Sequence, residues 1–187
     1  MEQASNPTHP WFTWANVLTL IRALLALPTA FCVYHAAWLP ATLCFAVAVV
    51  TDAMDGPLAR RLGQASALGG LLDHATDALF VTAVLAAAAL TGSVTWLLPV
   101  LIPFAFTQYV IDSSALRGRP LRGNRLGRLN GISYFVLAGA VIAAPLGMSA
   151  WPRLAPDGTA LIWWVSVALV LTTGCSMIDR ARRLQAG

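Results

Sequence analysis

The chain contains no lysine, little cysteine and few charges of any kind. Of its 187 residues, 11% are charged and 58% hydrophobic, against about 25% and roughly 45–50% in soluble domains. So few charges cannot cover a water-exposed surface, and disordered, collagen-like and coiled-coil chains are excluded as well. The three cysteines lie singly in apolar stretches, which excludes a disulfide framework and predicts buried, reduced thiols. We therefore expect a protein embedded in a lipid bilayer.

Six apolar stretches are long enough to cross a bilayer, which takes about 20 mostly apolar residues. They cover roughly residues 15–37, 39–62, 69–91, 94–114, 127–147 and 159–179. The connections between them are too short to form a soluble domain. The sequence therefore predicts an all-α, polytopic membrane protein with six transmembrane helices, in which residues 1–187 form a single domain.

Arginine supplies all 12 positively charged side chains, and its distribution predicts the orientation. Ten arginines fall on one side of the six-helix arrangement, and only Arg153 falls clearly on the other. The positive-inside rule then places both termini in the cytoplasm, as in a protein of a bacterial inner membrane. Arginines beside apolar runs suit lipid headgroups and phosphate substrates better than nucleic acid, so we expect no nucleic-acid partner.

Four of the eight acidic residues, Asp52, Asp55, Asp73 and Asp77, lie close together on the second and third apolar stretches. An acidic side chain within a membrane is costly unless it is paired or hydrated, so it marks a functional site. The spacings i, i+3 and i, i+4 place each pair on one helix face. The short connection predicts that the two helices pack antiparallel against each other, so that all four carboxylates converge on a pocket near the cytoplasmic surface.

Four neighbouring carboxylates need positive counter-charge. Arg60 and Arg61 are too few to balance them, and ligands that are all oxygen favour Mg²⁺ or Mn²⁺ over zinc. Two such cations about 4 Å apart can hold a diphosphate and stabilise attack at phosphorus. We therefore predict that the four aspartates bind two divalent cations, Mg²⁺ or Mn²⁺.

These residues form one continuous pattern, Asp52-x2-Asp55-Gly56-x2-Ala59-Arg60-x8-Gly69-x3-Asp73-x3-Asp77. The pattern resembles the signature of the CDP-alcohol phosphotransferase family at every defining position. Asn16-x2-Thr19-x2-Arg22 also resembles a frequent opening of the family's first helix. The resemblance implies six transmembrane helices and transfer of a phosphatidyl group from CDP-diacylglycerol to a small alcohol, with release of CMP, in phospholipid synthesis.

The resemblance also implies roles for individual residues. Asp52, Asp55 and Asp73 would be metal ligands, and Asp77 would be a ligand, the general base that accepts the proton of the acceptor hydroxyl, or both. The residues that would line the pocket for the cytidine diphosphate group are Gly56, Ala59, Arg60 and Gly69. Similar proteins are often homodimers.

The identity of the acceptor depends on an arginine-rich connection before the fifth apolar stretch. If the fifth helix begins early, Arg122, Arg125 and Arg128 share one helix face and could bind a phosphorylated acceptor such as glycerol 3-phosphate, but the positive-inside rule explains them equally well. Leu126-Gly127-Arg128 resembles the Leu-Gly-Lys segment of phosphatidylglycerophosphate synthases. His74 and Ala78, however, occupy positions where such enzymes commonly have proline and lysine. Inositol phosphate or another alcohol therefore stays an alternative acceptor.

Two further classes of membrane protein use buried acids. An intramembrane prenyltransferase also binds a diphosphate through aspartates and Mg²⁺, but Thr51 and Ala59 replace two residues of its usual motif. A cation transporter uses acids as an ion site, but transporters more often have repeated halves. Release of CMP from CDP-diacylglycerol would distinguish all three classes.

Overall fold

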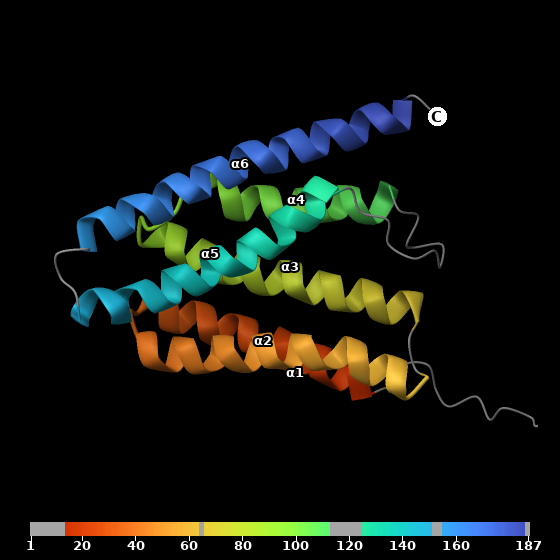
Figure 1. Ribbon diagram of the computed structural model, residues 1–187, viewed down its shortest axis with the longest axis horizontal. Helices are drawn as coiled ribbons and strands as arrows, with labels where there is room; N and C mark the ends of the chain where they lie inside the picture. Colours follow the sequence, from red (N-terminus) through yellow and green to blue (C-terminus); the bar gives the residue numbers. More distant parts are fainter. Residues whose placement is uncertain (1–13, 64–65, 113–124, 151–154, 186–187) are drawn as a thin grey trace, which may run out of the picture.

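Figure 1 shows the computed structural model, a bundle of helices that lie roughly along one axis. The structure describes residues 14–63, 66–112, 125–150 and 155–185, and no strand occurs among them. The helices are α1 (Trp14–Tyr34), α2 (Trp38–Arg61), α3 (Ala67–Leu90), α4 (Leu97–Asp112), α5 (Arg125–Ala150) and α6 (Ala155–Gln185). The prediction of an all-α protein with six helices is confirmed.

Five helices, all except α4, are long and apolar enough to cross a membrane. The helix α4 is also apolar but has 16 residues, fewer than the predicted 94–114. The outer surface of α1 carries Leu24, Leu27 and Phe31, which are 67%, 75% and 65% exposed. Large apolar side chains on the outside suit a lipid environment, and the chain is an integral membrane protein.

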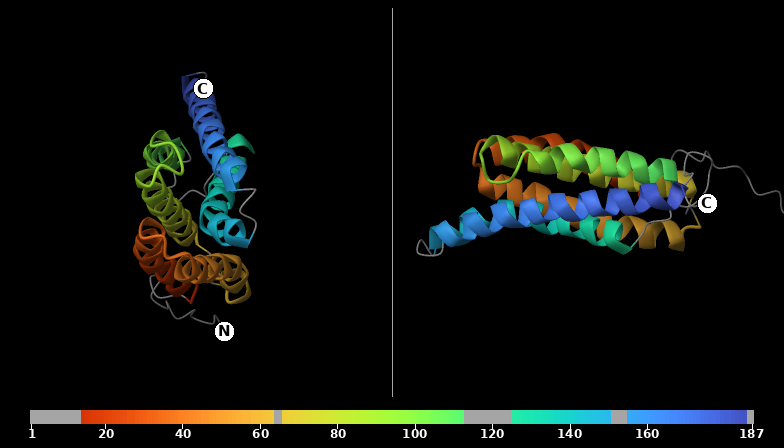
Figure 2. Two further views of the ribbon diagram at one scale, coloured as in Figure 1. Left: turned by 90° about the vertical axis from the view of Figure 1, so that its left-hand side faces the viewer. Right: turned by 90° about the horizontal axis from the view of Figure 1, so that it is seen from above.

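Successive helices run in opposite directions, so the acid-bearing ends of α2 and α3 lie at one end of the bundle. The end of α4, the start of α5 and the end of α6 lie at this same end, on the right in Figure 1 and again on the right in the second view of Figure 2. Most arginines of the described residues therefore lie at the same end of the bundle as the acids.

The expectation that α2 and α3 pack against each other was wrong. Among the described helices, α1 makes close backbone contacts with both α2 and α3, whereas α2 and α3 share none of comparable extent. The reason is the inner face of α1, whose buried residues recur every three or four positions, as in a helix packed on one side. These buried residues are Thr19, Arg22, Ala26, Thr29 and Val33.

Three aromatic rings close the core below the acids. Phe80 lies one turn beyond Asp77, and its ring stacks on that of Phe135 with centroids 6.1 Å apart. Phe45 of α2 packs against both rings at 6.1 and 6.5 Å. These contacts join α2, α3 and α5 next to the acid-bearing end of the bundle.

The cysteine prediction held in part. Cys32, Cys44 and Cys175 are all free thiols, but Cys175 is exposed and the other two are half-buried. In a membrane protein, apolar residues are stable both on the lipid-facing surface and in the core. An apolar stretch of sequence therefore does not show which of the two positions a cysteine occupies.

Candidate active site

A short turn joins the two helices that carry the acids. Gly63 ends α2 in the left-handed conformation (φ +65°), which glycine adopts without strain. Ser66 then begins α3, and its hydroxyl accepts a hydrogen bond from the Gly69 N–H at 2.9 Å. Such N-caps stabilise a helix by about 1 kcal/mol. Gly63 and Ser66 thus define where α2 ends and where α3 begins.

The four predicted aspartates do converge, and Arg22 of α1 lies at their centre. Its Nη1 atom lies 3.1 Å from Asp52 and 2.8 Å from Asp73 and also contacts Asp77, while Nη2 lies 2.5 Å from Asp55. The Arg22 side chain is 0% exposed. One guanidinium therefore bridges four carboxylates from two helices.

The sequence did not predict Arg22 as the partner of the acids: Arg60 and Arg61 were the only arginines considered as counter-charge, and the charge was assigned to divalent cations instead. A signal was present, because an arginine in the middle of an apolar helix is costly unless it faces a polar interior. Removing one partner of a buried ion pair usually costs about 3–5 kcal/mol, so this contact also holds α1 against α2 and α3. Four negative charges against one positive charge still leave three in excess.

The carboxylate oxygens are suited to a divalent cation. One oxygen each from Asp52, Asp55 and Asp73 lie within 4.8 Å of one another. A set made only of carboxylate oxygens suits a hard cation such as Mg²⁺ or Mn²⁺. Asp77 is not part of this close group, although the sequence places it among the ligands. The acid cluster could thus hold a divalent metal ion.

A cavity of about 220 Å³, which we call the small cavity, opens between α1, α2 and the start of α3. It contains all four residues that the sequence assigned to the cytidine diphosphate group. Its lining residues are Asn16, Thr19, Asp55, Gly56, Ala59, Arg60, Ser66, Gly69, Gly70 and Asp73. The structure therefore brings this predicted set together beside two of the acids.

Two glycines of the small cavity, Gly56 and Gly69, leave little space for a larger residue. A Cβ atom on Gly69 would lie 3.1 Å from the Ser66 hydroxyl and 3.7 Å from the Asn16 side-chain oxygen, and one on Gly56 would lie 3.3 Å from Nη1 of Arg60. A flat base or a diphosphate can approach the backbone closely at these positions.

A second cavity of about 590 Å³, the large cavity, lies between α3, α4, α5 and α6. Asp52 and Asp77 reach it from the side of the acid cluster, and Ser66 and Gly70 line both cavities. Its deeper walls are apolar and include Val81, Ile102 and Phe135. The acids therefore lie at the boundary between the two cavities.

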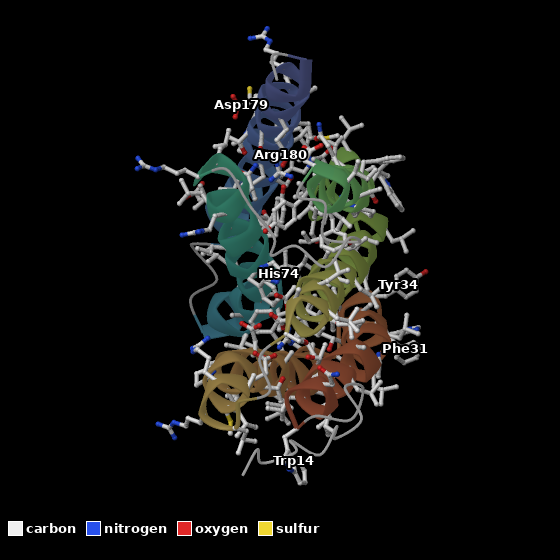
Figure 3. The ribbon with its side chains drawn as sticks, turned by 90° about the vertical axis from the view of Figure 1, so that its right-hand side faces the viewer. Trp14, Phe31, Tyr34, His74, Asp179 and Arg180 are labelled. Atoms are coloured by element: carbon white, nitrogen blue, oxygen red, sulfur yellow. The ribbon has the colours of Figure 1, made fainter. Side chains whose placement is uncertain are left out.

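Basic and polar groups line the mouth of the large cavity. Figure 3 looks onto this end of the bundle and shows His74 and Arg180 lying between α5 on one side and α3 and α4 on the other. The Arg180 guanidinium lies 4.9 Å from the centre of the Tyr109 ring and donates to the Ala105 carbonyl at 3.4 Å. From the sequence alone, Arg180 was only one of the ten arginines expected on the cytoplasmic side.

The three arginines predicted to bind the acceptor have different outcomes. Arg128 lines the large cavity, whereas Arg125 is exposed and is not among its lining residues. Arg122 lies outside the residues that the structure describes. The helix α5 is described from Arg125 onward, so the predicted face shared with Arg122 is not tested, and only Arg128 of the described pair reaches the cavity.

A hydrogen-bonded pair of side chains joins α5 to α6 within the large cavity. Thr173 donates to the Leu169 carbonyl at 2.6 Å, so its oxygen accepts the hydrogen bond of the Tyr134 hydroxyl at 2.5 Å. Both side chains are buried and line the cavity. This pair fixes the separation of the two helices that form one wall.

The fold and the site thus define an integral membrane protein with an acid cluster between two cavities. The sequence matches the CDP-alcohol phosphatidyltransferase family over residues 12–175. This match covers most of the chain, and the chain therefore belongs to that family of phospholipid-synthesising transferases. The family uses CDP-diacylglycerol and an alcohol acceptor in a lipid bilayer, and membership favours phosphatidyl transfer over prenyl transfer or cation transport.

Curated relatives differ in the acceptor that their names give. A probable phosphatidylglycerophosphate synthase of Mycobacterium tuberculosis is 30% identical over 90% of this chain and 81% of its own length. An archaetidylinositol phosphate synthase of Pyrococcus horikoshii is 38% identical over 43% of each chain. A CDP-diacylglycerol–glycerol-3-phosphate 3-phosphatidyltransferase of Pseudomonas fluorescens is 37% identical over 37% of each chain. No solved structure matches the chain.

Proposed function

We propose that this enzyme transfers the phosphatidyl group of CDP-diacylglycerol to glycerol 3-phosphate and releases CMP. The observation that carries the proposal is the placement of four aspartates at the boundary between two cavities. One cavity has small residues and Arg60, and the other has Arg128 and Arg180 at its mouth. A donor and a phosphorylated acceptor can then approach the same acids from opposite sides of α3.

In this proposal the small cavity binds the cytidine diphosphate group. Gly56, Ala59 and Gly69 leave room for the nucleotide beside the backbone, and Arg60 donates to a phosphate oxygen. The acyl chains of the donor stay in the bilayer beside the helices.

The large cavity receives the acceptor, and Arg128 and Arg180 bind its phosphate. Guanidinium groups suit this role because they can donate two parallel hydrogen bonds to phosphate oxygens. Asp77 faces this cavity and takes the proton of the attacking hydroxyl. The hydroxyl oxygen bonds to the phosphorus of the phosphatidyl group, the bond from that phosphorus to the bridging oxygen breaks, and CMP leaves.

Two divalent cations, Mg²⁺ or Mn²⁺, belong to the proposed site. Asp52, Asp55 and Asp73 would hold them, with Asp77 as a further ligand, because the oxygens of the first three already lie close together. The cations supply positive charge to the diphosphate and to the leaving CMP.

For orientation and assembly we propose what the sequence predicts. Residues 1–187 form one transmembrane domain in a bacterial inner membrane, with both termini and the acids on the cytoplasmic side. The arginines near the acid-bearing end support this orientation through the positive-inside rule. A homodimer stays a prediction from the family resemblance.

Inositol phosphate is a second candidate acceptor. The large cavity, at about 590 Å³, is within the range of pockets that enclose drug-sized ligands and has space for more than a three-carbon acceptor. The match to an archaetidylinositol phosphate synthase points in the same direction.

A direct comparison of acceptors tests the proposal. Purified enzyme would receive labelled CDP-diacylglycerol with glycerol 3-phosphate, inositol phosphate, inositol, serine or phosphatidylglycerol separately, and the lipid product would be identified. We expect phosphatidylglycerophosphate from the first reaction. Product from inositol phosphate alone would support the second candidate, and product only from the uncharged acceptors would contradict the role of Arg128 and Arg180.

A further inference from the structure

Arg22 is buried in the acid cluster, and the proposed reaction gives it no role. Its side chain is 0% exposed and contacts all four carboxylates to which the divalent cations are assigned. Only Nε has no hydrogen-bond partner in the part of the chain that the structure describes. The two terminal nitrogens thus occupy the polar centre that a cation would need.

The contacts within the cluster indicate competition rather than shared binding. Oxygens of Asp52, Asp55 and Asp73 lie within 4.8 Å of one another, and a guanidinium nitrogen of Arg22 already lies 2.5–3.1 Å from an oxygen of each of them. A cation coordinated by these oxygens needs the lone pairs and the space that the guanidinium now occupies. A divalent cation and a guanidinium a few ångströms apart also repel each other strongly inside a protein.

We propose that Arg22 is the resident counter-ion of the cluster and that divalent cations bind by displacing its guanidinium from the carboxylates. The inference rests on the metal site proposed above. Arg22 then has two effects of opposite sign. It stabilises the folded bundle by neutralising part of the acid charge, and it weakens cation binding by occupying the same oxygens.

The experiment measures binding of Mn²⁺ alone to the full-length, detergent-purified enzyme, by electron paramagnetic resonance of the free ion. Arg22→Gln should bind Mn²⁺ at least tenfold more tightly than the wild type. Arg182→Gln removes the same charge from an exposed position near the end of α6, and its affinity should stay within twofold. In chelator, Arg22→Gln should unfold at a lower temperature than the wild type. Addition of Mn²⁺ should raise the Tm of Arg22→Gln by more than it raises the Tm of the wild type.

Arg22→Lys provides a second test if the glutamine variant does not fold in chelator. Lysine keeps the charge but has a single nitrogen, so it cannot bridge the two sides of the cluster, and Mn²⁺ affinity should rise several-fold. A folded Arg22 variant that binds Mn²⁺ as the wild type does, or more weakly, would overturn the displacement while leaving the metal site intact. If neither the wild type nor any variant bound Mn²⁺, the metal site itself would be contradicted, and the displacement with it.

Discussion

Three arginines at one end of the bundle should contribute unequally to acceptor binding, because their surroundings differ. Arg180 is half-buried, and both the Tyr109 ring and the Ala105 carbonyl hold its guanidinium in place. Arg128 lines the same cavity but is exposed, and Arg125 is exposed outside it. Replacing each by glutamine removes the charge and keeps a hydrogen-bonding group of moderate size.

The magnitudes follow from the burial of each group. A hydrogen bond to a charged group contributes about 1.5–3 kcal/mol, and about 1.4 kcal/mol corresponds to a tenfold change. The loss of binding free energy in Arg180→Gln should be near the upper value, because the guanidinium of Arg180 is held in place. This loss should raise the KM for glycerol 3-phosphate about a hundredfold. Solvent screens an exposed charge, so Arg128→Gln should cost about tenfold or less. Arg125→Gln should change KM by less than about twofold.

The assay is steady-state kinetics in both substrates for all three variants, with Tm as a check on folding. The KM for CDP-diacylglycerol should hardly change, because Arg60 and the small cavity bind the donor. A loss in Arg125→Gln equal to that in Arg180→Gln would show that the arginines act only through overall charge. Unchanged acceptor kinetics in Arg180→Gln and Arg128→Gln would refute a phosphorylated acceptor in the large cavity.

Three further predictions address other parts of the site. Asp77→Asn should lower kcat by about 10²-fold or more, the usual scale for loss of a general base, while CDP-diacylglycerol still binds; a near-normal kcat would exclude this role. Gly69→Ala places a Cβ 3.1 Å from the Ser66 hydroxyl, so it should raise the KM for CDP-diacylglycerol several-fold. Its Tm should not fall, because alanine favours helix over glycine by about 1 kcal/mol. Tyr134→Phe deletes the hydrogen bond to Thr173 and should lower the free energy of unfolding by about 1 kcal/mol, measured by thermal denaturation; an unchanged stability would mean that the pair does not join α5 to α6.

The helices and the acid cluster could be predicted because both depend on local patterns. Apolar stretches of membrane-spanning length mark the helices, and spacings of three and four residues place Asp52 with Asp55 and Asp73 with Asp77. The family pattern then grouped Gly56 and Gly69 with these acids, and they line the same cavity.

The partners of these residues could not be predicted, because they depend on how each helix is rotated and which neighbours it contacts. Arg22 meets the acids because the inner face of α1 packs against both α2 and α3. Arg128 and Arg125 are only three positions apart, yet only Arg128 lines the large cavity. Arg180 is distant in sequence from every other candidate and joins them through the packing of α6 against α4 and α5.

The most direct measurement is CMP release from CDP-diacylglycerol by the purified enzyme, with glycerol 3-phosphate present, in EDTA and after re-addition of cation. The acid cluster carries four carboxylates against one guanidinium, so turnover should require further positive charge. We expect CMP release to stop in EDTA and to return with Mg²⁺ or Mn²⁺. Full CMP release in chelator would contradict the metal-dependent site, and no CMP release under any condition would contradict phosphatidyl transfer itself.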